Sequence, residues 1–324
     1  MMKKCNVYEK QTEQGGFEML VTLKQILNLC EAKKCAVGSF NTPNLESVMA
    51  VIGAAEEMNV PVIIQHAEVH EEIMPIRIIG PIMIEMAKRA KVPVCVHLDH
   101  GENLDYVCKA LNLGFTSVMY DGSVLSFEEN MANTKMVVSF AKQTGASVEA
   151  EIGCMGKRET GSGSAGNGKD PEKIYTDPDQ AKIFVEATGI DALACSFGTT
   201  HGVYLSEPKL DFSVVENVRK KANIPVVMHG GSGVSPEDFR KAIEKGVRKV
   251  NYYTYMAMAG GETIAEQFRM GCIPVEKDGK HYKYCYSLVE SGKDTPIMYH
   301  DIVQWGTQAM KENCKKAMEI FAMR

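Results

Sequence analysis

The chain has 324 residues, of which 45% are hydrophobic and 24% charged, the balance of a globular protein that buries a large core. Its net charge of -5 comes from 36 basic and 41 acidic residues without long blocks of one sign, which argues against a nucleic-acid or anionic-membrane partner. No apolar stretch approaches the roughly 20 residues that span a bilayer, and the first residues lack the apolar centre of a signal peptide. We therefore expect a cytoplasmic protein that acts on a small molecule.

The ten cysteines are scattered along the chain, and no two of them form a CxxC pair. Several stand in apolar runs that are typical of strands. We interpret them as buried or incidental thiols in a reducing compartment.

Short β-branched runs alternate with longer amphipathic segments along most of the chain, which predicts parallel strand–helix units. The pattern predicts eight strands, at 36–41, 61–67, 93–100, 117–123, 147–153, 192–198, 225–231 and 247–254. Helical patterns lie between them, for example at 45–59, 127–145, 177–189 and 235–246. The last of these opens with Ser235 before Pro236 and closes on a glycine, as helices commonly do.

Eight consecutive units without a change of composition favour one closed (β/α)8 TIM barrel, of the α/β class, over a two-domain doubly wound protein. We expect a single domain over 1–324, with its core near 21–260 and an extension at 261–324. Residues 21–34 predict an extra helix before the first strand, at the bottom of the barrel. The extension after the eighth helix is predicted to be helical.

One segment, 154–176, is rich in glycine and follows the fifth predicted strand. Structureless loops of this length in a compact domain are usually functional lids or disordered. In a barrel this position opens onto the active face, so we favour a lid.

Polar residues gather where barrel enzymes carry their chemistry, at the carboxyl ends of the strands. Histidines end three different strands: His97 and His100 the third, His201 the sixth and His229 the seventh. Imidazoles that converge from separate strands suit Zn²⁺ or another borderline divalent ion. The alternative is that each is a hydrogen-bonded structural histidine, and we assign His66, His70, His281 and His300 to structural or surface positions.

Asp99 stands directly before His100 at the end of the third strand. Strand alternation places these two side chains on opposite faces unless the strand end bends. A carboxylate beside a metal centre can move a proton, or it can orient a histidine. We favour the catalytic role.

The run His229-Gly-Gly-Ser-Gly, followed by Asn251 and Thr254 at the eighth strand, resembles a phosphate cradle. Loops after the seventh and eighth strands commonly hold phosphate in barrels. A glycine-rich turn alone is more often only a tight turn. The interpretation as a phosphate site therefore depends on the position of this run after the seventh strand.

With these residues assembled, the chain resembles the class II, metal-dependent ketose-bisphosphate aldolases from about residue 22 to 254. The resemblance rests on several ordered motifs: PVCVHLDHG (93–101), SVMYDGS (117–123), VEAEIGCMGKRE (148–159), FGTTHGVY (197–204), VMHGGSG (227–233) and the Asn251-x-x-Thr254 spacing.

The resemblance implies a role for each matching residue. His100, His201 and His229 would bind zinc, with Glu151 as an alternative ligand, and a monovalent cation would be a further candidate. Asp99 would be the acid/base at the hydroxyl of the cleaved carbon, and Glu159 would move the proton at carbon 3 of the dihydroxyacetone phosphate half. That half would be held by Gly202, Gly230, Ser232, Asn251 and Thr254, with Asn41 lining the pocket.

The chemistry supports this scheme independently. Cleavage beside a carbonyl leaves an enediolate, which a divalent cation stabilises as a Lewis acid. The other aldolase strategy uses a lysine Schiff base. No predicted strand carries a lysine near its carboxyl end, and Lys249, the nearest exception, precedes Asn251.

Departures from the family pattern concentrate on the aldehyde side. Ala67 stands where many members have serine, and Tyr253 stands where fructose-bisphosphate enzymes often have aspartate. Lys157 replaces a usual small residue, and no arginine region for a distal phosphate is recognisable in 255–324.

The leading interpretation is a metal-dependent aldolase for a ketose phosphate, foremost fructose 1,6-bisphosphate, with tagatose bisphosphate or another ketose 1-phosphate next. A metallohydrolase barrel is less favoured because residues 36–41 lack the paired histidines that such barrels often place there. A non-catalytic sugar-phosphate-binding barrel would need neither Asp99 nor Glu159. We also expect a homo-oligomer, a dimer or a tetramer.

Overall fold

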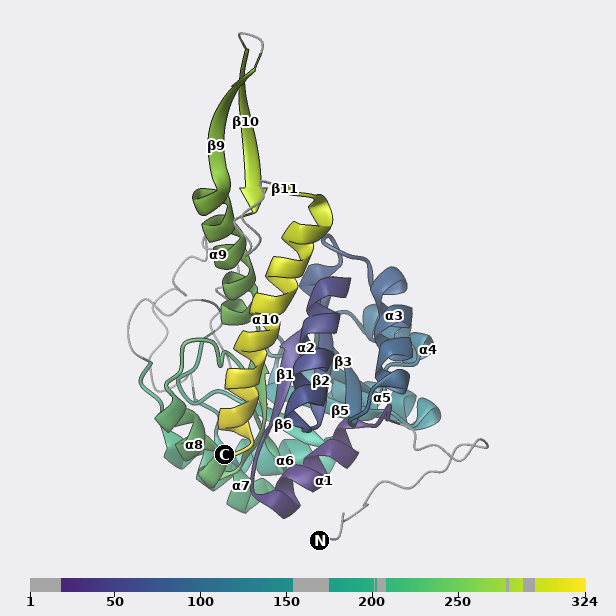
Figure 1. The fold of residues 1–324 in the computed structure, drawn as a ribbon. Helices are drawn as coiled ribbons and strands as arrows, with labels where there is room; N and C mark the ends of the chain where they lie inside the picture. The colour runs from purple at the N-terminus through teal and green to yellow at the C-terminus, as the bar shows by residue number, and fades with distance from the viewer. Residues whose placement is uncertain (1–18, 154–174, 201, 203–207, 278–279, 288–294) are drawn as a thin grey trace, which may run out of the picture.

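The computed structural model describes residues 19–153, 175–200, 202, 208–277, 280–287 and 295–324. Eight parallel strands form a closed barrel in the order β1 to β8 (Figure 1). The strands are β1 Val37–Asn41, β2 Val62–Ala67, β3 Val94–Gly101, β4 Ser117–Tyr120, β5 Ser147–Ile152, β6 Ala192–Cys195, β7 Val226–Met228 and β8 Val247–Tyr252. All eight predicted strands are present, and the predicted (β/α)8 barrel is confirmed.

A ring of helices covers the outside of the barrel. It contains α2 Leu45–Met58, α3 Ile76–Arg89, α4 Leu104–Leu113, α5 Phe127–Thr144, α6 Pro178–Thr188, α7 Phe212–Ala222 and α8 Pro236–Lys245, with the short 3-10 helix η1 Glu68–His70 before α3. Side chains set the helix ends: the Ser235 hydroxyl accepts the N–H of Asp238 at the start of α8, and Gly246 ends that helix with a φ of 127°. The predicted cap and closing glycine of α8 are both confirmed.

The helix predicted before the first strand is α1, Leu23–Lys33. Its buried side chains, Leu23, Ile26, Leu27 and Cys30, form a separate cluster with inward-facing residues of the barrel strands. These partners are Val37, Ile63, Cys95, Met119, Ala192, Ala194 and Val227. They come from the beginnings or middles of their strands, so α1 closes the amino-terminal end of the barrel.

The extension beyond β8 contains the predicted helical structure and a small sheet that was not predicted. It comprises α9 Thr254–Gly271, β9 Cys272–Lys277, β10 Lys280–Ser287, β11 Thr295–Pro296 and α10 Tyr299–Phe321, and the three strands form an antiparallel sheet. Tyrosines recur at every second position of β10, a period and a residue type that favour strands. Figure 1 shows α9 and the β9–β10 hairpin projecting away from the barrel.

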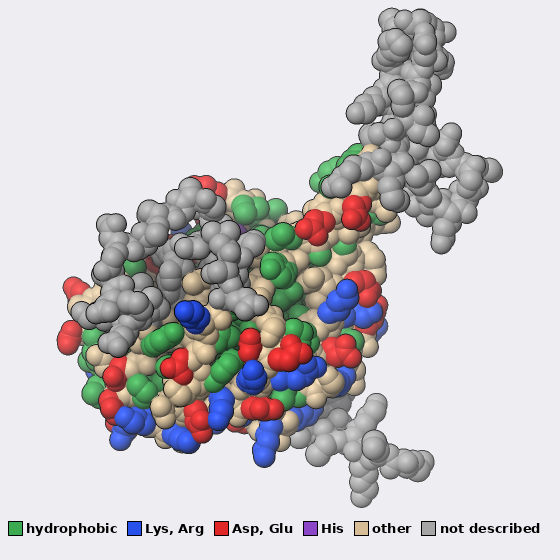
Figure 2. Space-filling model, turned by 90° about the vertical axis from the view of Figure 1, so that its left-hand side faces the viewer, with side chains coloured by type: hydrophobic (Ala, Val, Ile, Leu, Met, Phe, Trp, Pro, Cys, Tyr) green, Lys and Arg blue, Asp and Glu red, His purple; other side chains and the backbone are tan. Residues whose placement is uncertain are grey.

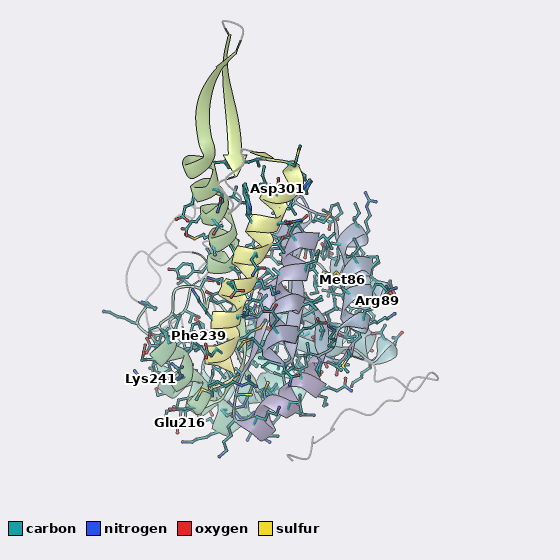
Figure 3. All side chains as sticks on the ribbon, viewed as in Figure 1. Met86, Arg89, Glu216, Phe239, Lys241 and Asp301 are labelled. Carbon is teal, nitrogen blue, oxygen red and sulfur yellow. The ribbon has the colours of Figure 1, made fainter. Side chains whose placement is uncertain are left out.

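Helix α10 returns to the barrel and completes the ring of helices between α8 and α2 (Figure 1). Its buried residues Cys314, Ala317, Met318 and Phe321 belong to the main core. Phe239 of α8, labelled in Figure 3, packs against Phe321 with ring centroids 5.0 Å apart. The sequence pattern placed these residues in an extension that the strand–helix repeat does not require. In the structure, α10 is part of the barrel wall.

Acidic and basic side chains are interspersed over the described surface that faces the viewer in Figure 2. Such mixing agrees with the absence of long like-charge blocks in the sequence. Within the described residues, no helix has the length and apolar character needed to cross a membrane.

Candidate active site at the carboxyl ends of the strands

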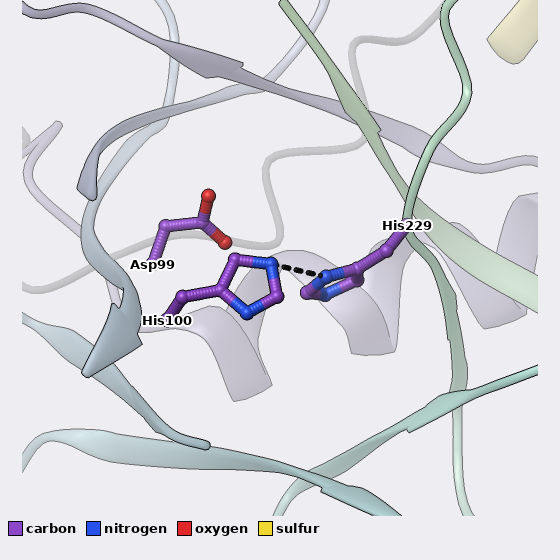
Figure 4. A group of neighbouring side chains, drawn as sticks. All are labelled: Asp99, His100 and His229. Atoms are coloured by element: carbon purple, nitrogen blue, oxygen red, sulfur yellow. Dashed lines mark hydrogen bonds between the residues drawn. The ribbon is translucent and has the colours of Figure 1, made fainter. Parts of the chain in front are cut away.

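Two histidines face each other at the centre of the barrel mouth (Figure 4). His100 lies at the end of β3 and His229 directly after β7, and His229 Nδ1 is 2.9 Å from His100 Nε2. Their rings are nearly perpendicular. Together with Asp99 they form a group whose candidate ligand atoms lie within 4.8 Å of one another.

A bend at the end of β3 allows Asp99 and His100 to share this site. His100 has a φ of 43°, in the left-handed region, and the pairing of β3 with β4 shifts register between Leu98 and Gly101. Such irregularities re-aim side chains at the rims of barrels. The bend overrides the alternation that would place neighbouring side chains on opposite faces.

Carboxylates hold the outer nitrogen of each histidine. His100 Nδ1 is 2.7 Å from Asp121 Oδ2, and His229 Nε2 is 2.8 Å from Glu149 Oε1. Metal-binding histidines usually hold a carboxylate or carbonyl on the nitrogen that does not face the metal. The donor set therefore fits a divalent ion of the zinc type, with His100 Nε2 and His229 Nδ1 as its ligand atoms.

The pKa values of the two imidazoles are shifted in opposite directions. Burial would lower the pKa of His100, but the carboxylates of Asp99 and Asp121 outweigh it and raise that pKa to about 10. The pKa of His229 is lowered, chiefly by burial. A metal ion that binds His100 must therefore displace a proton.

Asp99 is buried, and three amide groups bind its carboxylate. Asn251 Nδ2 donates to Oδ1 over 2.9 Å, while Asn41 Nδ2 and Gln65 Nε2 donate to Oδ2 over 2.9 and 3.0 Å. Burial opposes ionisation, yet the neighbouring His100, His229 and Lys249 hold the pKa of Asp99 well below its usual range. Asp99 is thus an oriented carboxylate that favours its ionised form.

A buried lysine connects the two sides of the site. Lys249 Nζ lies 2.9 Å from Glu149 Oε2 and donates to Asn251 Oδ1 over 2.7 Å. Glu149 holds His229, and Asn251 holds Asp99. The side chain of Lys249 is fully buried and links Glu149 with Asn251.

Seven residues singled out in the sequence line one pocket beside this centre. The lining comprises Asn41, Asp99, Gly202, Gly230, Ser232, Asn251 and Thr254 from that set, with Gly231, Tyr252 and Tyr253. Gly230 has a φ of 66°, and a Cβ there would lie 2.4 Å from the Thr200 carbonyl oxygen. Thr254 is the first residue of α9, which places a helix amino terminus at the pocket.

The other predicted residues fall in three groups. Glu151 is buried in β5 and belongs to a second candidate metal group with His100 and Asp121. His201, Glu159 and most of the predicted lid lie outside the described residues. His97 is not in the metal group: its Nδ1 is 2.8 Å from the Ser117 hydroxyl.

Sequence reasoning missed the supporting roles of Gln65, Asp121, Glu149 and Lys249. Each is a polar residue within or directly after an apolar barrel strand, which is the signal that could have found them. It also set His66 and His70 aside, although both are buried and His70 lies 5.2 Å from the ring of Tyr253, a residue of the pocket.

Comparisons with known proteins identify the family of this chain. A family described as "Fructose-bisphosphate aldolase class-II" matches residues 21–324. The chain is 38% identical to the probable fructose-bisphosphate aldolase of Bacillus subtilis over 283 residues, which cover 86% of this chain and 95% of the relative. It is 40% identical to the fructose-bisphosphate aldolase of Geobacillus stearothermophilus, covering 76% of this chain and 85% of the relative.

Among solved structures, the YdjI aldolase of Escherichia coli K12 superposes with a TM-score of 0.76 and 33% identity, covering 94% of this chain and 97% of that one. The range matched by the family, residues 21–324, spans the barrel and the carboxyl-terminal extension. By sequence and by structure, the chain belongs to the class II fructose-bisphosphate aldolase family.

Proposed function

We propose that this protein is a zinc-dependent aldolase, a carbon–carbon lyase that reversibly cleaves a ketose 1-phosphate into dihydroxyacetone phosphate and an aldehyde. One observation carries the proposal. Two imidazoles with carboxylate-held outer nitrogens stand beside a carboxylate that three amides orient, at the edge of a pocket with a helix amino terminus.

The ligands proposed for the ion are His100, His229 and His201, with Glu151 as an alternative. His201 rests on the family resemblance, since it lies outside the described residues. When bound, the divalent ion would stabilise the enediolate charge as a Lewis acid. Zinc is favoured because imidazole donors suit it. A monovalent cation is a further candidate from the resemblance alone.

Asp99 acts on the hydroxyl group of carbon 4 in this scheme. Its ionised carboxylate takes the hydroxyl proton as the carbon 3–carbon 4 bond breaks and carbon 4 becomes the aldehyde carbonyl. The three amide donors fix the carboxylate before substrate arrives, so little reorganisation is needed. Glu159, carried over from the resemblance, would return a proton to carbon 3.

The phosphate of the dihydroxyacetone half would lie between the turn after β7 and the start of α9. Gly230 allows close approach of backbone, Ser232 and Thr254 add hydroxyl groups, and the helix amino terminus favours an anion. Gly202 and Asn251 complete this side of the pocket.

The aldehyde half determines which ketose is cleaved. Fructose 1,6-bisphosphate is our first candidate because the relatives from Bacillus subtilis and Geobacillus stearothermophilus carry that name. Tyr253 and Ala67 depart from the fructose-bisphosphate pattern, so tagatose bisphosphate and other ketose 1-phosphates follow. We further propose a cytoplasmic homo-oligomer.

A panel of phosphorylated ketoses, assayed with and without a chelator, tests reaction and substrate together. We expect chelation to abolish cleavage, zinc to restore it, and borohydride to trap no lysine adduct. Dihydroxyacetone phosphate should also exchange its carbon 3 proton in deuterated water without any aldehyde. Absence of exchange in the zinc-loaded enzyme would refute the aldolase, whereas exchange without cleavage of fructose bisphosphate would replace only the substrate.

A further inference from the structure

The end of α1 places two cysteines side by side through a backbone motif. Lys34 takes the left-handed conformation, with a φ of 52°. The N–H of Cys35 donates to the carbonyl of Cys30 over 3.0 Å, and the N–H of Lys34 to the carbonyl of Glu31. This is the Schellman arrangement, in which the residue after the left-handed one usually contacts the side chain five residues earlier. Here both contacting residues are cysteine.

The neighbouring thiols affect each other's pKa in opposite directions. Interaction with Cys30 lowers the pKa of Cys35 to about 7, and interaction with Cys35 raises that of Cys30 well above its usual value. Lys33, Arg248 and Arg324 further favour the Cys35 thiolate. By contrast, burial raises the pKa of Cys95 to about 12.

Both thiols line a cavity of about 140 Å³ between α1 and α10. Cys30 is 1% exposed, whereas Cys35 is half-buried, so a reagent reaches Cys35 first. Lys33 and Arg324 also line the cavity. Because α1 closes the amino-terminal end of the barrel, this cavity is remote from the candidate active site at the carboxyl ends of the strands.

We propose that Cys30 and Cys35 form a reversible dithiol–disulfide site that takes a hydroperoxide as its oxidant. The Cys35 thiolate attacks one peroxide oxygen, the O–O bond breaks, and the other oxygen leaves as an alcohol or water after protonation. The resulting Cys35 sulfenic acid is attacked by the Cys30 sulfur, which forms the S–S bond and releases water. The two sulfurs lose two electrons and the peroxide gains them.

The backbone motif makes this oxidation compatible with the fold. The hydrogen bond between Cys35 and Cys30 already closes the loop that the disulfide would close. The bond therefore needs little backbone movement, and such a short loop adds little stability. Oxidation should leave the barrel folded.

The test treats the reduced, full-length protein with one equivalent of hydrogen peroxide, blocks the remaining thiols by alkylation, and maps peptides by mass spectrometry. We expect a disulfide between Cys30 and Cys35 that dithiothreitol reverses. In the Cys30→Ser variant, dimedone should trap a sulfenic acid at Cys35. In Cys35→Ser, oxidation at Cys30 should fall at least tenfold.

Cys108→Ser is the matched control, because Cys108 is also a partly exposed cysteine on a barrel helix. It should leave the Cys30–Cys35 disulfide unchanged. Alkylation of Cys35 in the untreated protein should show a midpoint near pH 7, a readout independent of any variant's folding. The proposal is overturned if both thiols survive while other cysteines oxidise, or if Cys35 alkylates no faster than Cys108 at neutral pH.

Discussion

The two carboxylate oxygens of Asp99 accept hydrogen bonds from amide groups on β1, β2 and β8. Three donors from three different strands are more than is needed to hold one strand in place. In the proposed mechanism this arrangement aligns a base with the two candidate metal-binding imidazoles, as a proton transfer coupled to bond cleavage needs.

Replacing Asp99 with alanine should lower kcat by roughly 10²–10⁴, the usual range for a lost acid/base group. Metal content, measured by elemental analysis, should stay near one ion per chain. If metal occupancy falls together with the rate, Asp99 supports the metal rather than the proton transfer.

Asp121 contacts His100 Nδ1, and in the proposed site it would act through that histidine. The Asp121→Asn variant should weaken metal binding roughly 10–100-fold, as loss of such a carboxylate partner commonly does. Competition with a chromogenic chelator measures this directly. Asp105→Asn, at an exposed position on α4, is the control and should bind metal as the parent does. Equal affinities for Asp121→Asn and the parent would contradict the role assigned to Asp121.

Burial lowers the pKa of His66 to about 4, against about 6.5 in an unfolded chain. Between these values the unfolded chain binds more protons, so stability falls as pH falls, by up to about 1.4 kcal/mol per pH unit from this group. Its contribution is fully present above about pH 6.5. Neither ring nitrogen has a hydrogen-bond partner among the described residues, so phenylalanine is a suitable replacement.

Urea unfolding at a series of pH values tests this. In His66→Phe, the free energy of unfolding should fall less steeply with pH between about pH 6.5 and pH 4 than in the parent protein. His300→Phe changes an exposed histidine and should leave that slope as it is. An unaltered slope in His66→Phe would show that the residue is not buried in its neutral form.

At the scale of elements, the sequence predicted every barrel strand because β-branched runs and helix caps are local signals. The sequence also predicted most of the residues that line the pocket, because the carboxyl ends of all barrel strands lie at the same end of the barrel. The bend at His100 was not predictable, because it depends on the register between β3 and β4. The proximity of Cys30 and Cys35 was not predicted either. It depends on the left-handed conformation of Lys34, and the glycine that usually marks such a helix end is absent there.

Helix α10 offers the clearest test of an element's contribution. Phe321 is 1% exposed and packs against Phe239 and Tyr252. Phe321→Ala should lower the free energy of unfolding by about 3–5 kcal/mol. Tyr299→Ala, at the 80% exposed start of the same helix, should change it by less than about 0.5 kcal/mol. Similar losses in both variants would mean that α10 packs differently.

At the scale of the whole molecule, stability and chemistry occupy opposite ends of the barrel. Helix α1 closes one end with apolar side chains, and the other end carries the candidate metal ligands and the pocket. Barrel enzymes generally divide in this way. The β9–β10 hairpin belongs to neither end, since it projects beyond the barrel (Figure 1).

The β9–β10 hairpin is extended only by the two-residue strand β11, and so small a sheet is marginally stable in water without further packing, so we expect it to contact a second copy of the chain. Sedimentation should give a dimer or tetramer, and deletion of residues 272–296 should reduce the assembly. A full-length monomer at micromolar concentration would contradict this expectation.

The position of α10 in the wall has a consequence for synthesis on the ribosome. The N–H of Ala36, just before β1, donates to the carbonyl of Phe321, although hundreds of residues separate them. Contacts of such long range form late and slow folding. While the chain is still being made, apolar residues around β1 and α2 lack their cover, and exposed apolar surface favours aggregation. A nascent chain that contains all eight strands therefore still lacks part of the barrel wall until α10 has been made.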